Sequence, residues 1–165
     1  MQKTLRTVGV GGTFDELHRG HRALLMKAFQ TGQRVIIGVS SDEFVRRMKK
    51  PHKTASYAAR YKELKSFLKK HGFLERAEII SIDDPSGGVL LSNGPIEALV
   101  VSQETEATAM KINEKRKKIG LAPLHIVAIN MVPSENHSTI STTRIRRGEI
   151  DREGHVLHML KSAGK

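Results

Sequence analysis

A glycine-rich turn near the start of the chain most constrains how this sequence folds. The apolar residues Val8 and Val10 alternate before two glycines, and an apolar helical spacing begins at Leu24. This pattern predicts a strand, a tight turn and the first turn of a helix. Gly11 and Gly12 carry no Cβ, so a ligand can approach the backbone closely at this turn.

Two histidines, His18 and His21, stand where this helix is expected to begin, in the string Gly-Thr-Phe-Asp-Glu-Leu-His-Arg-Gly-His at residues 12–21. A helix N-terminus offers unpaired N–H groups and a partial positive charge, which favour an anion. If the helix begins near His18, both imidazoles lie on one face of its first turn. Metal ligands and plain surface residues are the competing interpretations of the pair, but two histidines without a third ligand close by make a poor zinc site. The stretch therefore predicts binding of nucleotide phosphates.

Strands and helices alternate through the rest of the chain. Continuous apolar runs typical of buried parallel strands occupy residues 34–40, 77–82, 98–102 and 124–129. Helices are expected over 41–47, over 57–68 after a Ser56 cap, over 107–119 and over 142–147, with Gly32, Gly72 and Gly120 as stops. We predict a single Rossmann-like α/β domain over residues 1–165, with a five-stranded parallel sheet and helices on both faces. From about residue 151 the tail has the spacing of a further helix, loosely attached, although Gly154 and Gly164 interrupt it.

Ligands of such sheets bind beyond the carboxyl ends of the strands. Thr13, Lys49, Ser102 and Asn130 each follow a predicted strand. We therefore expect these four positions to border one cleft.

Composition narrows the class of partner. The chain has no cysteine, which excludes disulfides and thiolate metal sites. It has no apolar run of membrane-spanning length and begins without an apolar signal segment, so we expect a cytoplasmic protein that does not bind membranes. The formal charge of +11 favours anionic partners, either small polyanionic substrates or nucleic acid. Only five Phe and two Tyr are present, which disfavours stacking platforms for single-stranded RNA.

A second motif, Ile140-Ser141-Thr142-Thr143-Arg144-Ile145-Arg146, lies near the C-terminus. Together, the two stretches resemble the HxGH and ISSTxIR signatures of the nucleotidyltransferase superfamily. Its members transfer a nucleotidyl group from a nucleoside triphosphate to a phosphate or carboxylate acceptor. The resemblance implies the strand order 3-2-1-4-5.

The resemblance also implies a set of site residues. The expected ATP-binding residues are Gly12, Thr13, Phe14, His18, His21, Ser141, Thr142, Thr143, Arg144 and Arg146. The acceptor is expected at Thr13 and Lys49. Because an ionised phosphate oxygen is already a nucleophile, catalysis rests on in-line placement and charge stabilisation, and His18, His21 and Lys49 are the expected catalytic residues. Mg²⁺ is expected to be held mainly by substrate phosphates and water, with no residue as metal ligand, and Asp15 is expected to be a local turn or cap residue.

Within the superfamily, residues 6–150 most resemble the phosphopantetheine adenylyltransferases of the archaeal and eukaryotic type. The residues that carry this resemblance are Lys49-Lys50-Pro51, 100–105 and 112–116. It implies ATP and 4′-phosphopantetheine as substrates, and dephospho-coenzyme A and pyrophosphate as products. Bacterial enzymes of this activity have Arg-Gly-Leu-Arg after the fourth strand, where this chain has Ser102-Gln103-Glu104-Thr105, so no site residue is assigned there.

Two alternatives remain open at this point. The first is a nucleotidyltransferase with another phosphate acceptor: nicotinamide mononucleotide, flavin mononucleotide, or glycerol 3-phosphate with CTP as the nucleotide donor. The other alternative is a non-catalytic RNA-binding protein on the same scaffold. Both motifs are intact and the basic residues are scattered over 46–53, 111–118 and 144–147, which favours an enzyme without a specific nucleic-acid partner.

Overall fold

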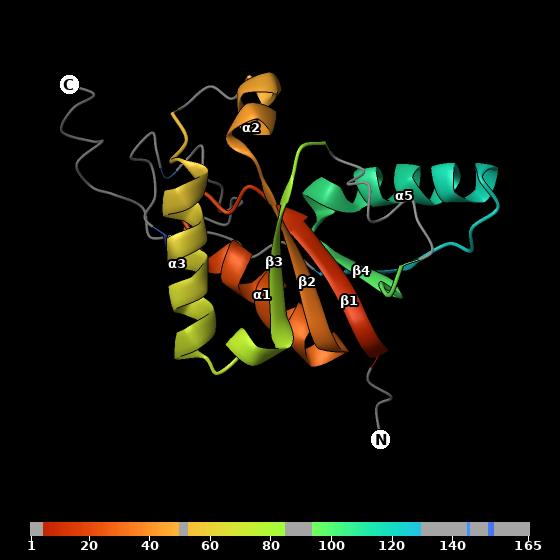
Figure 1. Cartoon of the computed structure of the whole chain (residues 1–165), viewed down its shortest axis with the longest axis horizontal. Coiled ribbons are helices and arrows are strands. Elements are labelled where there is room, and N and C mark those ends of the chain that lie inside the picture. The colour runs from red at the N-terminus through yellow and green to blue at the C-terminus, as the bar shows by residue number, and fades with distance from the viewer. Residues whose placement is uncertain (1–4, 50–52, 85–93, 130–144, 146–151, 154–165) are drawn as a thin grey trace.

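The computed structural model describes residues 5–49, 53–84, 94–129, 145, 152 and 153, and its strands form one parallel sheet (Figure 1). The strands are β1 (Leu5–Gly12), β2 (Gly32–Ser40), β3 (Ala77–Ile82), β4 (Ala98–Val101) and β5 (His125–Ala128). They lie in the order β3-β2-β1-β4-β5, and every neighbouring pair is parallel. The predicted sheet and the strand order implied by the resemblance are confirmed.

Side-chain alternation along the central strands separates two cores. Successive residues of a strand point to opposite faces of a sheet. Val8 and Val10 of β1 join the larger core with their β2 partners Val35 and Ile37, whereas Ile36 joins a second core. Both faces of the sheet centre are therefore apolar, as expected for parallel strands covered on both sides.

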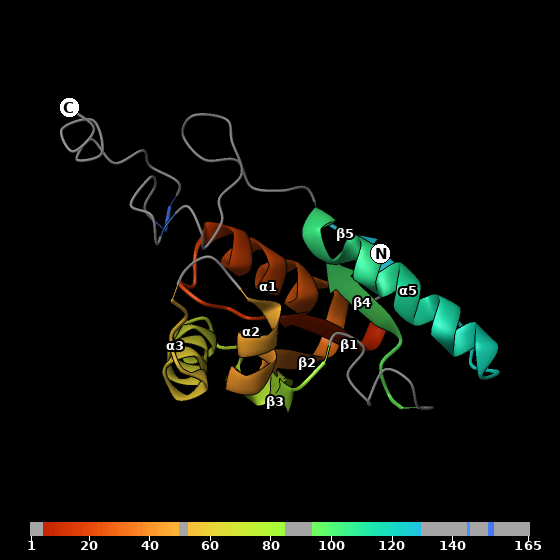
Figure 2. The ribbon, with the colours of Figure 1, turned by 90° about the horizontal axis from the view of Figure 1, so that it is seen from above.

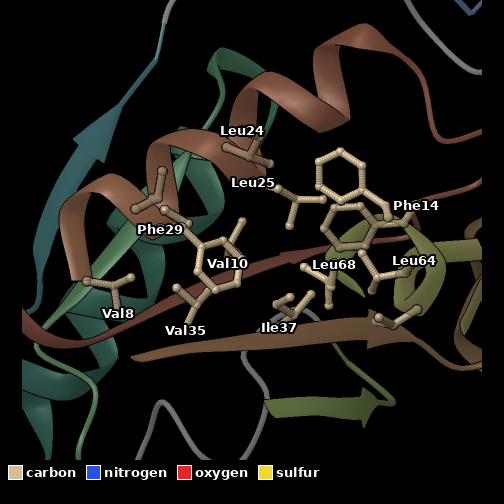
Figure 3. Packing of buried hydrophobic residues seen from close by; sticks show 14 of the residues in the cluster. Val8, Val10, Phe14, Leu24, Leu25, Phe29, Val35, Ile37, Leu64 and Leu68 are labelled. Atoms are coloured by element: carbon tan, nitrogen blue, oxygen red, sulfur yellow. The ribbon is translucent and has the colours of Figure 1, made fainter. Parts of the chain in front are cut away.

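Helices cover these two faces, as predicted (Figure 2). Helices α1 (Arg19–Thr31) and α3 (Tyr57–Lys70) lie on one side of the sheet, and α5 (Gln103–Lys118) lies on the other. Figure 3 shows how α1 and α3 fill the larger core, with Leu24, Leu25 and Phe29 from α1 and Leu64 and Leu68 from α3 packed over the strands. The second core holds Leu99, Val101, Ala109, Ile112 and Leu124.

Most helix ends lie where their capping residues indicate. Ser41 caps the short α2 (Asp42–Met48), and Ser56 caps α3. Gly72 and Gly120 follow their helices with φ of +73° and +83°, in the left-handed region that glycine enters without steric cost. The short 3₁₀ turn η1 (Leu74–Arg76) was not predicted.

One predicted helix start is wrong. The predicted stop at Gly32 is confirmed, because Gly32 is the C-cap of α1; its φ of −123° is extended, and it is also the first residue of β2. Helix α5 begins at Gln103 rather than at residue 107, because the Thr105 hydroxyl accepts a hydrogen bond from the Ser102 N–H at 3.1 Å and closes an earlier first turn. The predicted helix over 142–147 and the tail helix lie outside the described residues apart from isolated positions, and the single-domain boundary stays a prediction.

Candidate active site

The turn between β1 and α1 has an unusual backbone. Phe14 and Glu16 have φ of +54° and +52°, in the left-handed region that non-glycine residues rarely adopt. Such a residue costs about 1–3 kcal/mol and persists only where its surroundings hold it. Phe14 is buried in the larger core, so packing of its ring holds the turn in this shape. The strain therefore lies in the segment that connects Gly12 to the histidines.

The two histidines form a reciprocal cap at the start of α1. Nδ1 of His18, the N-cap residue, accepts a hydrogen bond from the His21 N–H at 3.2 Å, and Nδ1 of His21 accepts one from the His18 N–H at 3.3 Å. Their rings stack with centroids 3.6 Å apart and planes inclined by 17°. The Phe14 ring lies 5.4 Å from the His21 ring, centroid to centroid. The spacing of the motif therefore builds a pair of imidazoles fixed to the backbone.

These hydrogen bonds determine where each ring carries its proton. A nitrogen that accepts a hydrogen bond from a backbone N–H has no hydrogen of its own. In the neutral ring the hydrogen is then on Nε2, so both imidazoles present an N–H donor on the side away from their cap. Protonation of either ring at Nδ1 would break the cap. The arrangement therefore gives two neutral donors, which suit phosphate oxygens.

Gly20, between the two histidines, allows the His18 ring to lie against the helix. A Cβ at this position would meet His18 Cε1 at 2.8 Å, closer than real contacts allow, and Nδ1 at 3.0 Å, which is tighter than most. Any larger residue would push the ring out of its cap. The glycine of the HxGH motif is thus required by the packing of the first histidine.

Burial and neighbouring arginines keep His18 neutral. Its residue is 6% exposed. Burial chiefly, followed by the positive charges of Arg22 and Arg152, lowers the pKa of His18 from 6.5 to about 4. At neutral pH the ring is therefore an uncharged hydrogen-bond donor.

The expectation of unpaired amides at the start of α1 is wrong for two of them. The Arg19 N–H donates to the Arg152 carbonyl at 2.8 Å, and the His21 N–H donates to His18. The Arg152 side chain also bonds Glu16 at 2.9 Å and Glu63 of α3 at 2.6 Å, which fixes this carbonyl over the helix end. The helix end is partly occupied, so an anion must be met mainly by the imidazoles and the turn.

The acidic residues of the motif are engaged by protein groups. Asp15 is buried, and its Oδ1 accepts a hydrogen bond from the Ala55 N–H at 3.2 Å. This partner belongs to the segment before α3 rather than to the turn that contains Asp15. Within the described residues there is no group of three or more His, Asp or Glu side chains that would hold a metal ion.

Lys49 ends α2 in an unusual conformation. It is exposed, has a φ of +49°, and its N–H donates to the Arg46 carbonyl at 3.2 Å. Among the described residues its ammonium makes no hydrogen bond or ion pair, and no contact with the histidine pair is observed. Because α2 follows the carboxyl end of β2, the residue lies on the side of the sheet where the site forms.

The structure brings together only part of the predicted set. Gly12, Thr13, Phe14, His18 and His21 form one continuous turn. Ser102 caps α5 at the carboxyl end of β4, next to β1 in the sheet. The residues Ser141, Thr142, Thr143, Arg144 and Arg146, as well as Asn130, lie outside the described residues, so their roles stay predictions.

Sequence reasoning missed Arg60, which donates to the Thr13 carbonyl at 2.9 Å. A signal for it was present, because Arg60 lies four residues before Leu64 and so falls on the apolar stripe of α3. A charged residue on such a stripe indicates a buried polar contact. Arg152 had no comparable signal.

Comparison with known proteins agrees with this geometry. The family model described as cytidylyltransferase-like matches residues 10–148. The chain is 40% identical to the phosphopantetheine adenylyltransferase of Methanothermobacter thermautotrophicus, over 99% of this chain and 96% of that protein. It is 43% identical to the enzyme of the same name from Thermococcus kodakarensis, over 96% and 94% of the two chains.

Among solved structures, a protein of unknown function from Archaeoglobus fulgidus aligns with a TM-score of 0.68 and 32% identity, covering 83% of this chain and all of that one. The sheet order, the histidine turn and these nearly full-length matches all agree. The chain therefore belongs to the cytidylyltransferase-like family and, within it, to the phosphopantetheine adenylyltransferases.

Proposed function

We infer that this protein transfers the adenylyl group of ATP to 4′-phosphopantetheine, giving dephospho-coenzyme A and pyrophosphate. The observation that carries this inference is the agreement, over nearly the whole of both chains, with relatives named phosphopantetheine adenylyltransferase. The histidine pair supports the same chemistry, because two neutral N–H donors fixed beside a glycine turn suit a triphosphate.

The reaction exchanges one P–O bond for another. An oxygen of the acceptor phosphate attacks the α-phosphorus of ATP, the bond from this phosphorus to the bridging oxygen breaks, and pyrophosphate leaves. The attacking oxygen is already ionised, so the protein needs no nucleophile of its own. What remains is to place the two substrates in line and to stabilise the charge that builds on the phosphoryl oxygens.

We assign roles to the residues on this basis. His21 donates its Nε2–H to the α-phosphate and His18 donates to the rest of the triphosphate. The N–H and hydroxyl of Thr13 lie between the two reacting groups, at the end of the glycine turn. Lys49 receives the acceptor phosphate on the β2 side, and the residues Ser141, Thr142, Thr143, Arg144 and Arg146 bind the β- and γ-phosphates.

We propose Mg²⁺ as the accompanying ion. The acidic residues of the motif are engaged by protein groups, with Asp15 bonded to Ala55 and Glu16 to Arg152. This fits an ion that substrate phosphates and water hold and that no protein carboxylate ligates. When bound, the ion supplies positive charge to the phosphates.

Pyrophosphate release tests the proposal. The protein is incubated with Mg²⁺ and ATP, and with 4′-phosphopantetheine or with pantetheine, which lacks the phosphate. We expect pyrophosphate release and dephospho-coenzyme A only with the phosphorylated acceptor. Faster release with nicotinamide mononucleotide, flavin mononucleotide, or glycerol 3-phosphate and CTP would instead assign another acceptor within the superfamily.

His21→Glu provides the matched inactive variant. Glutamate is a natural third residue of a capping box, so its carboxylate can keep the bond to the His18 N–H, while it has no hydrogen to donate to a phosphate. We expect turnover to fall by about 10²- to 10³-fold with the melting temperature nearly unchanged. Turnover close to that of the wild type, in folded protein, would remove His21 from the mechanism.

A further inference from the structure

A buried guanidinium lies at the carboxyl ends of the two central strands. Arg60 projects from α3, and its side chain is 1% exposed. Its Nη1 donates to the carbonyls of Thr13 at 2.9 Å and Ser40 at 2.7 Å. Its Nε donates to the Ala55 carbonyl at 2.9 Å, and Nη2 bonds Oδ1 of Asp42 at 3.1 Å. One side chain therefore connects four points that belong to three separate segments of the chain.

These points belong to three segments, and the proposed reaction needs those segments at fixed positions relative to one another. Thr13 ends the glycine turn that follows β1. Ser40 and Asp42 mark the junction of β2 with α2, the helix that ends at Lys49. Ala55 lies where the chain returns toward α3. Arg60 therefore holds the turn of residues 11–18, called the nucleotide turn below. It also holds Ser40, Asp42 and Ala55, which lie on either side of Lys49 in the sequence and are called the Lys49 segment below.

The Ala55 peptide is held from both sides. Its N–H donates to Asp15 of the nucleotide turn at 3.2 Å, while its carbonyl accepts from Arg60. The nucleotide turn and the segment after Lys49 are thus linked twice, once through a carboxylate and once through a guanidinium. Such a double link fixes both the separation and the orientation of the two segments.

A charged side chain is a costly way to achieve packing alone. Removing a guanidinium from water costs solvation, and three of the four acceptors of Arg60 are neutral carbonyls. The single carboxylate, Asp42, is 49% exposed and also accepts from the Tyr57 N–H at 2.7 Å. What the planar fork provides is several fixed donors on one rigid group, which a smaller or neutral side chain cannot supply.

We propose that Arg60 is a positioning residue, which sets Thr13 and the Lys49 segment at the separation that places the acceptor phosphate in line with the α-phosphorus. This rests on the adenylyl transfer proposed above. Arg60 does not touch substrate; it acts through the carbonyls that it holds. Small errors in such alignment cost rate rather than affinity, because each substrate keeps its own contacts.

Arg60→Lys tests this, with Arg76→Lys as the matched control. Arg76 also donates to three carbonyls, those of Phe29, Gly32 and Gln33, but these lie at the end of α1 and the amino end of β2. Both substitutions keep the charge and remove the fork. We expect Arg60→Lys to lower kcat by about 10- to 100-fold, with the Kd of ATP alone changed by less than about threefold. Arg76→Lys is expected to lower the melting temperature and leave kcat unchanged.

The outcomes separate the two proposals. Absence of pyrophosphate release from the wild type would overturn the proposed function itself. With an active wild type, an Arg60→Lys kcat that falls no further than that of Arg76→Lys would overturn the positioning role, as would a loss of ATP affinity as large as the loss of rate. If Arg60→Lys does not fold, Asp42→Ala removes one half-exposed contact of the fork. A kcat for Asp42→Ala equal to the wild type then overturns the proposal, and a reduced kcat with unchanged ATP affinity supports it.

Discussion

At the residue scale, the histidine pair shows how a short motif determines both shape and protonation. Each ring uses Nδ1 to satisfy a backbone N–H at the start of α1, so Nε2 carries the donor hydrogen. The glycine between them allows the His18 ring to pack against the helix. The structural role and the chemical role therefore fall on different nitrogens of the same ring, and a substitution that preserves one role can still remove the other.

Stability below neutral pH should report the burial of His18. Its pKa is lowered to about 4 in the folded protein and is 6.5 in the unfolded chain, so the unfolded state binds the proton first as pH falls. The folded state therefore loses stability as pH falls from 6.5 toward 4, by about 2 kcal/mol at pH 5.

The substitution His18→Asn isolates this effect. Asparagine is a good N-cap residue and does not titrate, so the cap is kept and the proton linkage is lost. We expect the free energy of unfolding, measured by urea denaturation, to fall less between pH 7.5 and 5 in the variant than in the wild type. Parallel pH dependences for the two proteins would contradict the neutral, buried His18.

At Lys49 the backbone conformation and the proposed function favour different residue types. It caps α2 at a φ of +49°, where glycine is favoured and lysine is strained. Lys49→Gly should therefore leave stability unchanged or raise it by about 0.5–1 kcal/mol, yet weaken acceptor binding because the charge is lost. Separate titrations with ATP and with 4′-phosphopantetheine, alongside thermal unfolding, measure both effects. Equal losses of affinity for the two ligands would exclude Lys49 as the acceptor-phosphate residue.

At the element scale, the sequence pattern predicted most of the fold because parallel strands buried on both faces form continuous apolar runs. Ser41 and Ser56 likewise indicated the starts of α2 and α3, and the left-handed glycines Gly72 and Gly120 indicated the ends of α3 and α5. The start of α5 was missed because residues 103–106 are polar and carry no apolar period. Only the Ser102–Thr105 hydrogen bond, a feature of side-chain geometry, determines where that helix begins.

The candidate site was predictable where its contacts are local and not where they are distant. The histidine turn is contained within a few residues, so its spacing is visible in the sequence. Arg60 reaches Thr13 and Ser40, which are 47 and 20 residues away in the chain. Only the packing of α3 against the ends of β1 and β2 creates that cluster. No local pattern indicates which backbone carbonyls a buried arginine will find.

Asn113 belongs to the stretch 112–116 that carries the resemblance to the family, yet its contacts are structural and hold the connection from α5 to β5. Asn113 accepts from the Leu124 N–H at 2.8 Å and donates to the Leu124 carbonyl at 3.0 Å. Asn113→Ala should therefore destabilise the protein by about 1–3 kcal/mol, since both backbone groups lose their partner.

Catalysis should not change with this substitution. The exposed neighbour Glu114 supplies the control variant Glu114→Ala, which we expect to leave stability nearly unchanged. Urea denaturation and turnover measured below the melting temperature distinguish the two effects. A kcat reduced by Asn113→Ala in fully folded protein would show that this connection contributes to the site.

At the scale of the whole molecule, the charge of +11 is the property that most favours the alternative function, RNA binding. Of the basic run at the end of α5, Lys115, Lys117 and Lys118 are exposed, whereas Arg116 is buried and donates to the Ala122 carbonyl at 2.8 Å. The run therefore does not present four cations to one partner. No helix within the described part of the chain is long and apolar enough to cross a bilayer.

We therefore expect only weak RNA binding, with a Kd of about 10⁻⁴ to 10⁻⁶ M at physiological salt and no sequence preference. Because such binding arises from released counterions, it should weaken steeply between about 50 and 200 mM salt. Filter binding with two single-stranded RNAs of unrelated sequence measures this, and ATP titration with and without RNA tests for competition. If the phosphate site is separate from the scattered surface charges, the ATP affinity will be the same in both titrations. Nanomolar, sequence-selective RNA binding, together with no pyrophosphate release for any acceptor, would favour a binding protein over an enzyme.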